Sequence, residues 1–348
     1  MCTSPLYRIG RFALELGGGN LPPALFSALK SKGQCIIGWR EYLDWRDRYL
    51  IPDYMFQMLP CGKCTECRIK KSKEWATRCV AEKMTSDGDC WFVTLTYNDT
   101  KLHFAECFDR QFAVLDKRDP QLFFKRLRKA LYGSKKGNLR YFLSGEYGDR
   151  TFRPHYHAII YNLSIPDLQI YKIVKKTVYY KSDWLQQIWK NGYVVIGKVN
   201  NKTCAYTASY TLKKVGFAVS PQSALDRLLQ IKDQAITPEY MRCLCASGLI
   251  QRPFALMSRR KAIGREYFDQ HPQSVENGLP EFPISKISYF DNLVKKLDPF
   301  AFEDLKDYRG SIAEAARKQT EACLICPEEV RFMLREEYRD KCRPRNKI

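Results

Sequence analysis

The sequence is poor in three features, and the shortages narrow the classes of protein it can belong to. No window of its 348 residues approaches the roughly 18 to 20 uninterrupted apolar residues of a membrane-spanning helix, and its amino-terminal segment has no apolar signal core. Acidic residues are outnumbered, with 38 Asp and Glu against 58 Lys and Arg, which leaves a net charge of +20. Histidine occurs four times. We therefore expect a soluble protein that is not secreted and has no membrane partner.

The excess of positive charge favours a polyanionic partner, because each Lys or Arg that neutralises a phosphate releases a counterion. General solubility or attraction to anionic lipid explains the same charge equally well. The chain also has 14 cysteines. Without a secretion signal, these are typical of reduced thiols or metal ligands, which suits a cytosol-like compartment.

Strand and helix patterns alternate in the middle of the chain. They predict, in order, a strand over 91–97, a helix over 119–133 that ends at Gly133, a hairpin of 139–148 with 155–163, a helix with Ser182 as its N-cap, a strand over 193–199 and a helix over 201–216. This order predicts an α+β fold in which helices pack on a central, largely antiparallel sheet.

The flanking regions have other patterns. A basic amphipathic helix follows Pro60, and the chain beyond Gly216 has mainly helical spacing. We expect three parts: an N-terminal region over 1–89 with a cysteine cluster and the basic helix, a catalytic domain over 90–216, and a mainly helical C-terminal region over 217–348.

Two of the four histidines, His155 and His157, lie two residues apart in a strand, so both imidazoles face the same side of the sheet. Neutral imidazoles a few ångströms apart suit a divalent metal. Glu146 lies on the preceding strand, and the turn between the strands would bring its carboxylate beside them. The three side chains are candidate metal ligands, and as a bare H-x-H triplet they also fit a pair of ordinary core or surface histidines.

A second group of candidates lies on the helix over 201–216. Tyr206 and Tyr210 are four residues apart and Lys213 follows three later, so the three share one helix face. A phenol with a pKa near ~10 attacks a substrate only if a cation or metal assists it. The same spacing is also typical of packing residues.

Four cysteines have spacing that permits a structural zinc site: Cys61, Cys64, Cys67 and Cys79. Buried or free thiols are the alternative.

Basic clusters form a third group. Arg126 and Arg128 belong to one, and Arg259 and Arg260 to another. They are solvated faces by default, and around a DNA site they would bind phosphates while aromatics such as Trp91, Phe152, Tyr156 and Trp184 stack on bases.

The order of these motifs resembles the HUH endonucleases, a family of rolling-circle replication initiators and relaxases. The shared features are a TLTY-type strand, a hairpin with a carboxylate and an H-x-H triplet, and a YxxxYxxK helix. More narrowly, several runs between Pro60 and Phe268 resemble the replication initiators of gokushovirus-type microviruses, which are single-stranded DNA phages: PCGKCTECRIKKSKEWATRC, SGEYG with RPHYHAII, CAYTASYTLKK and FALMSRRKAIGREYF.

The resemblance implies an HUH fold and a metal-dependent, site-specific single-strand DNA endonuclease and ligase. His155, His157 and Glu146 would hold Mg²⁺ or Mn²⁺. Tyr206 and Tyr210 would attack in turn and form 5′-phosphotyrosine, with Lys213 offsetting the phenolate charge. The implied partners are single-stranded origin DNA and the host DNA polymerase and helicase, in the cytoplasm of an infected bacterium.

The rival hypothesis is a non-catalytic, zinc-containing basic nucleic-acid-binding protein in which Tyr206 and Tyr210 merely pack.

Overall fold

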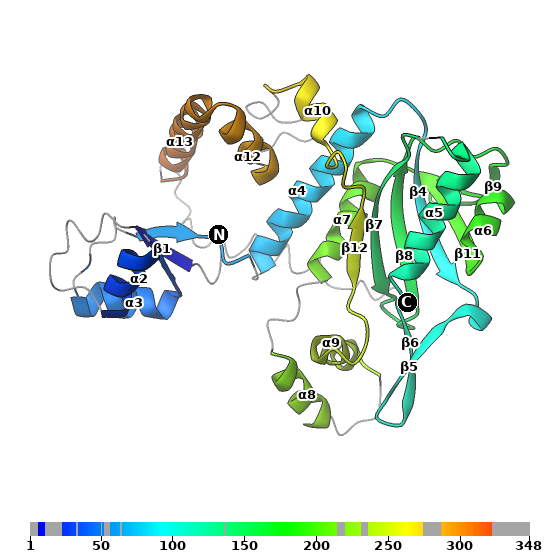
Figure 1. The fold of residues 1–348 in the computed structure, drawn as a ribbon, viewed down its shortest axis with the longest axis horizontal. Helices are drawn as coiled ribbons and strands as arrows, with labels where there is room; N and C mark the ends of the chain where they lie inside the picture. The colour runs from blue at the N-terminus through cyan, green and yellow to red at the C-terminus, as the bar shows by residue number, and fades with distance from the viewer. Residues whose placement is uncertain are drawn as a thin grey trace. The chain divides into compact units, whose positions relative to one another are not determined.

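The computed structural model describes residues 6–10, 23–32, 34–49, 51, 56–62, 65–135, 137–213, 220–230, 236–273 and 287–321. The chain forms two compact units, Met1–His271 and Pro272–Ile348 (Figure 1). Among the described residues, no helix is both long enough and apolar enough to cross a membrane.

A seven-stranded sheet is the centre of the first unit, with the strand order β12-β7-β8-β4-β11-β10-β9. Every pairing in it is antiparallel. The strands are β4 (Cys90–Tyr97), β7 (Arg140–Tyr147), β8 (Pro154–Tyr161), β9 (Gln169–Val174), β10 (Thr177–Lys181), β11 (Gly192–Lys198) and β12 (Phe254–Met257). The predicted α+β class with a central, largely antiparallel sheet is confirmed.

One face of this sheet is the main hydrophobic core. On β4 the alternation buries Val93, Leu95 and Tyr97, while the residues between them are half-buried on the other face. Two helices cover the core face, α5 (Arg118–Tyr132) and α6 (Asp183–Trp189), and they contribute Phe123 and Trp189 to the core. We call the opposite side of the sheet the site face.

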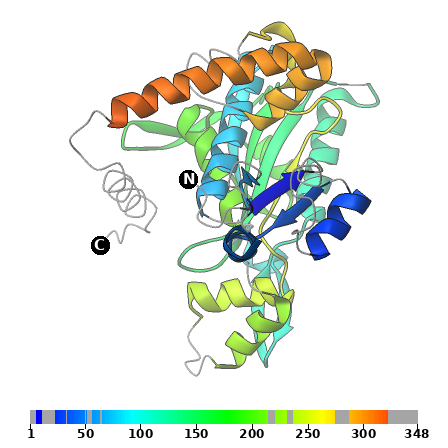
Figure 2. The same ribbon diagram turned by 90° about the vertical axis from the view of Figure 1, so that its left-hand side faces the viewer.

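Two other helices cover part of the site face. α4 (Thr65–Met84) and α7 (Asn201–Lys213) pack against each other and onto β7 and β8 (Figures 1 and 2). Trp75 of α4 stacks on Phe142 of β7 with 5.2 Å between ring centroids. The Tyr161 hydroxyl donates to the carbonyl of Cys79 at 3.0 Å.

Helix ends follow from local chemistry. α5 ends at Tyr132 because Gly133 takes a positive φ of 58° and its N–H caps the Lys129 carbonyl. The Ser182 hydroxyl caps α6 as predicted and accepts from Leu185 N. α6 ends at Trp189, before the predicted end at Gly192, because Lys190 adopts the left-handed conformation.

Several elements were not predicted. β1 (Leu6–Gly10), β2 (Gln34–Ile37) and β3 (Phe56–Leu59) form a three-stranded sheet that shares a small core with α2 (Pro23–Lys32) and α3 (Trp39–Tyr49). The N-terminal addition is therefore not purely helical. β5 (His103–Cys107) and β6 (Arg110–Val114) form a separate hairpin.

The chain beyond residue 216 is mainly helical, as expected. In the first unit it contributes α8 (Pro221–Gln230), α9 (Pro238–Ser247), α10 (Arg265–Gln270) and the edge strand β12, so the sheet includes a strand from outside the expected 90–216 domain. The second unit contains α12 (Ser288–Leu297) and α13 (Pro299–Glu321), which an ion pair between Arg309 and the buried Asp291 joins at 2.9 Å.

The first residue of β11 is a test of this packing. Gly192 has φ +152°, and a Cβ there would lie 2.3 Å from the Thr96 carbonyl oxygen and 2.4 Å from Asn98 N. We expect Gly192→Ala to lower the free energy of unfolding by roughly 2–4 kcal/mol in urea titrations, because backbone atoms have to move. Gly133→Ala is the control: it has a positive φ but no atom within 4 Å, and should cost only about 1 kcal/mol. Equal losses would contradict the close approach.

Candidate functional site

Polar side chains of three neighbouring strands meet on the site face. The strand register pairs Glu146 with His155 and Ser144 with His157, and it pairs the two histidines with Thr96 and Thr94 of β4. Paired residues of antiparallel strands point to the same face. Glu146, His155 and His157, predicted from the sequence as metal ligands, therefore lie together.

One carboxylate oxygen lies between the two imidazoles. Glu146 Oε1 is 2.9 Å from His155 Nε2 and 3.1 Å from His157 Nε2. Glu146 and His157 are almost completely buried, with 2% and 6% of their surface exposed. One ligand atom of each of the three residues lies within 4.8 Å of the others, a spacing that permits them to share one ion.

The hydrogen bonds around His155 test whether these residues fit a cation. His155 Nδ1 lies 3.0 Å from the carbonyl oxygen of Arg153, which can only accept, so Nδ1 carries a proton. In the neutral ring Nε2 then presents a lone pair to the Glu146 oxygen. Two acceptors this close require a cation, either a proton or a metal ion. The donor set of two imidazoles and a carboxylate therefore fits a divalent cation.

Neighbouring groups hold both rings in place. Thr94 Oγ1 lies 3.1 Å from His157 Nδ1 and so orients that imidazole. The Arg153 guanidinium ties the turn before β8 to the end of β4, since it donates to Asp99 and to the Tyr97 carbonyl, each at 2.6 Å. The ligand atoms are positioned before anything binds.

Tyr206 of α7 lies beside this cluster. Its ring centroid is 5.1 Å from that of His157 and 6.1 Å from that of Phe92. The side chain is 46% exposed, while Thr207 and Ala208, which follow it on α7, are buried. Tyr206 is therefore accessible to a substrate, unlike a packing residue of the core. α7 continues through Tyr210 and Lys213, whose side chains lie outside the described part of the structure.

The structure separates the four cysteines considered for zinc. The Sγ atoms of Cys61 and Cys67 are 4.0 Å apart, and Cys64 lies outside the described residues. Cys79 is twelve residues beyond Cys67 on the continuous helix α4, a rise of about 18 Å, and it is fully buried. As a correction to the sequence prediction, Cys79 lies too far away to share an ion with Cys67. For the other three thiols, zinc binding stays a prediction.

The four arginines considered for DNA occupy different positions. Arg126 donates to the carbonyls of Ile188 and Trp189 at 2.7 and 2.9 Å, so its guanidinium caps the end of α6. Arg259 and Arg260 are exposed in the loop after β12, and Arg128 lies over Tyr141 on the core face. None of these contacts is with the histidine cluster.

A second titratable cluster lies on the core face, and the sequence interpretation missed it. The buried hydroxyls of Tyr97 and Tyr156 are 2.7 Å apart, and Tyr97 also donates to Asp119 at 2.6 Å. His103 Nε2 lies 2.8 Å from the same carboxylate. Because Tyr156 is fully buried, it cannot stack on a base as the sequence suggested.

Comparison with known proteins agrees with this geometry. The family model for replication-associated proteins of the ORF2 type matches residues 90–215. The chain is 31% identical over 278 residues to the replication-associated protein ORF2 of Spiroplasma virus 4, covering 78% of each chain. It is 36% identical over 161 residues to protein VP4 of Bdellovibrio phage phiMH2K, covering 45% of this chain and 48% of that protein. For protein ORF4 of Chlamydia phage 1 the identity is 32% over 250 residues, or 69% and 59%. No solved structure matches.

The fold and these matches define the class: a viral replication-associated protein built on an antiparallel sheet. More narrowly, the chain belongs to the family of replication initiators of gokushovirus-type microviruses. Its role lies in the initiation of phage DNA replication.

The buried phenols predict the alkaline stability of the protein. Burial raises the pKa of Tyr97 and of Tyr156 far above the usual value, so both stay protonated in the fold. The unfolded chain releases these protons near pH ~10, so stability is intact below that pH and is lost above it, by about 1.4 kcal/mol per pH unit for each tyrosine. Tyr156→Phe should make this alkaline slope shallower in urea unfolding between about pH 9 and 11. An unchanged slope would contradict a buried neutral phenol at this position.

Proposed function

We propose that the protein nicks and rejoins single-stranded DNA at the phage origin by tyrosine transesterification, and so starts rolling-circle replication. The observation that carries this proposal is the exposed phenol of Tyr206 beside a buried cluster of two histidines and a glutamate. The family supplies the role in replication, and the site supplies the chemistry.

Glu146, His155 and His157 are the residues that would hold Mg²⁺ or Mn²⁺. The bound ion would supply Lewis-acid polarisation of the scissile phosphate. Imidazole ligands alone favour Mn²⁺ over Mg²⁺, so the choice of ion is left to experiment. Thr94 and the Arg153 carbonyl fix the two rings, so the ligands need no rearrangement.

Tyr206 is the proposed nucleophile. Its phenol oxygen attacks phosphorus and loses its proton to solvent, the bond from phosphorus to the 3′ oxygen breaks, and that oxygen leaves as a free 3′-OH after taking up a proton. The products are a 5′-phosphotyrosine and a primer end for the host polymerase. Attack of a 3′-OH on the phosphotyrosine reverses the step and rejoins the strand.

The remaining assignments extend this scheme. Tyr210 lies one helical turn from Tyr206 on α7 and would act as the second nucleophile, one tyrosine keeping the parental end while the other cleaves after a full circle. Lys213 would offset the phenolate charge. Strand separation falls to a host helicase, because the run Gly192–Val199 lacks the Ser or Thr that completes a P-loop and forms β11 instead. The host bacterial cytoplasm is the proposed compartment.

A covalent adduct tests this proposal. Incubated with Mn²⁺ and labelled single-stranded origin DNA, the protein should form an adduct that is visible on a denaturing gel. Because both tyrosines are nucleophiles, Tyr206→Phe should reduce the adduct and Tyr206→Phe with Tyr210→Phe should abolish it. His157→Ala should also abolish it, since a metal ligand is lost.

The exposed Tyr193→Phe, elsewhere on the sheet, serves as the matched control and should leave the adduct unchanged. If no origin DNA yields an adduct, or if the double Phe variant still forms one, the tyrosine mechanism fails. The non-catalytic nucleic-acid-binding alternative would then be favoured.

A further inference from the structure

Two arginines from distant parts of the sequence converge on Tyr141. Its ring stacks on Phe124 of α5, with centroids 3.6 Å apart and planes within 12°. One turn further along α5, the Arg128 guanidinium lies 5.5 Å from the Tyr141 centroid. The loop that carries Arg259 reaches the same residue: Ser258 N donates to the Tyr141 carbonyl at 3.0 Å, and Tyr141 N donates to Ser258 Oγ at 3.1 Å.

A buried network fixes the loop over 258–264 in this position. Glu82 of α4 is 4% exposed, and its carboxylate accepts from Arg140 Nε and, at 2.7 Å, from Gly264 N. Arg78 Nε donates to the Ile263 carbonyl at 2.9 Å. The loop is therefore held at both ends, and Arg259 is presented on a rigid support.

The two guanidiniums have no matching negative charge. Within the part of the chain that the structure describes, no carboxylate lies within 4.0 Å of Arg128 or Arg259. The nearby acidic residues Glu266 and Asp269 pair with Lys261 and Arg265. Burial raises the pKa of Tyr141, with the two arginines opposing the shift, so the phenol between them stays neutral. Two like charges held together without a counterion favour an anionic ligand.

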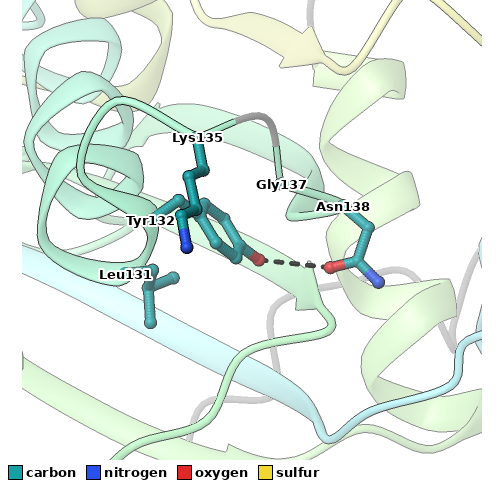
Figure 3. A pocket seen from close by; sticks show the side chains of 5 residues that line it. All are labelled: Leu131, Tyr132, Lys135, Gly137 and Asn138. Atoms are coloured by element: carbon teal, nitrogen blue, oxygen red, sulfur yellow. Dashed lines mark hydrogen bonds between the residues drawn. The ribbon is translucent and has the colours of Figure 1, made fainter.

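A hollow continues this surface along α5. Its lining includes Tyr132, Lys135 and Asn138, with the Tyr132 hydroxyl donating to Asn138 Oδ1 at 3.2 Å (Figure 3). Arg128, Tyr132 and Lys135 follow at spacings of four and three residues, so they share one helix face. The surface thus combines three cations with an aromatic ring and an amide, the groups that bind phosphates and bases of a single strand.

We propose that Arg128 and Arg259, extended by Lys135, form a second phosphate-binding site for DNA, separate from the nicking centre. This proposal rests on the proposed function, since its ligand is the DNA that the site cleaves. Tyr141 lies five residues before Glu146 on β7, about 16 Å away, and on the opposite face of the sheet. A long strand reaches both places, and an oligonucleotide that covers only the nick does not.

Salt dependence of binding tests the site. We compare the full chain with the double variant Arg128→Gln and Arg259→Gln on a long and a short single-stranded oligonucleotide. With the long one, the slope of log affinity against log salt should fall by about 1.4, the loss of two single-strand phosphate contacts. Adduct formation on the short oligonucleotide should stay at the level of the parent protein.

The matched control is Arg46→Gln with Arg48→Gln, which removes two charges from ion-paired positions of α3 and should leave the slope unchanged. Replacing Arg128 and Arg259 by Lys keeps the charge and should restore the slope, which separates charge from folding. An unchanged slope in the Gln variant, or an equal fall in the control, would overturn the second site. Absence of any adduct in the parent protein would instead overturn the nicking mechanism, because salt dependence is measured without cleavage.

Discussion

One carboxylate oxygen placed between two imidazole nitrogens is the contact on which the candidate site depends. It forms in a single register of β7 and β8, the one that pairs Glu146 with His155. A slip of one residue would turn Glu146 to the opposite face of the sheet, because side chains alternate. The turn before β8 secures this register, since Gly148 N donates to the Arg153 carbonyl at 3.1 Å and the same carbonyl sets the His155 tautomer.

The same strands build two different environments. On the core face, Tyr156 lies between the two histidines in sequence and forms a buried hydrogen bond with Tyr97. On the site face, α4 and α7 cover β7 and β8, and Tyr206 is left accessible beside His157. The dry face gives the sheet its rigidity, and the site face keeps a nucleophile within reach of the polar cluster. If the second phosphate site binds as proposed, one DNA strand engages both sides of this sheet.

Much of the fold could be predicted because its signals are local. The alternation of residues 91–97 and the H-x-H triplet define the faces of β4 and β8, and the short turn after Glu146 brings that residue to the histidines. The hairpins β9–β10 and β5–β6 were missed because their turns lack the usual Asn-Gly or Gly signal. Lys175 and Lys176, and Phe108 and Asp109, take positive φ there instead. Tertiary contacts were equally hidden: the use of Arg126 as a helix cap depends on α6, and the distance from Cys67 to Cys79 depends on α4 being continuous.

The most direct test of the account is Mn²⁺ binding followed by pulsed electron paramagnetic resonance, which detects nitrogen nuclei bound to the ion without any need for activity. The structure predicts one bound Mn²⁺ with coupling to two imidazole nitrogens, reduced to one nitrogen in His155→Ala or His157→Ala and unchanged in His271→Ala, which lies outside the cluster. Failure to bind Mn²⁺, or nitrogen coupling that persists when both cluster histidines are replaced, would contradict the central claim that Glu146, His155 and His157 form a cation site.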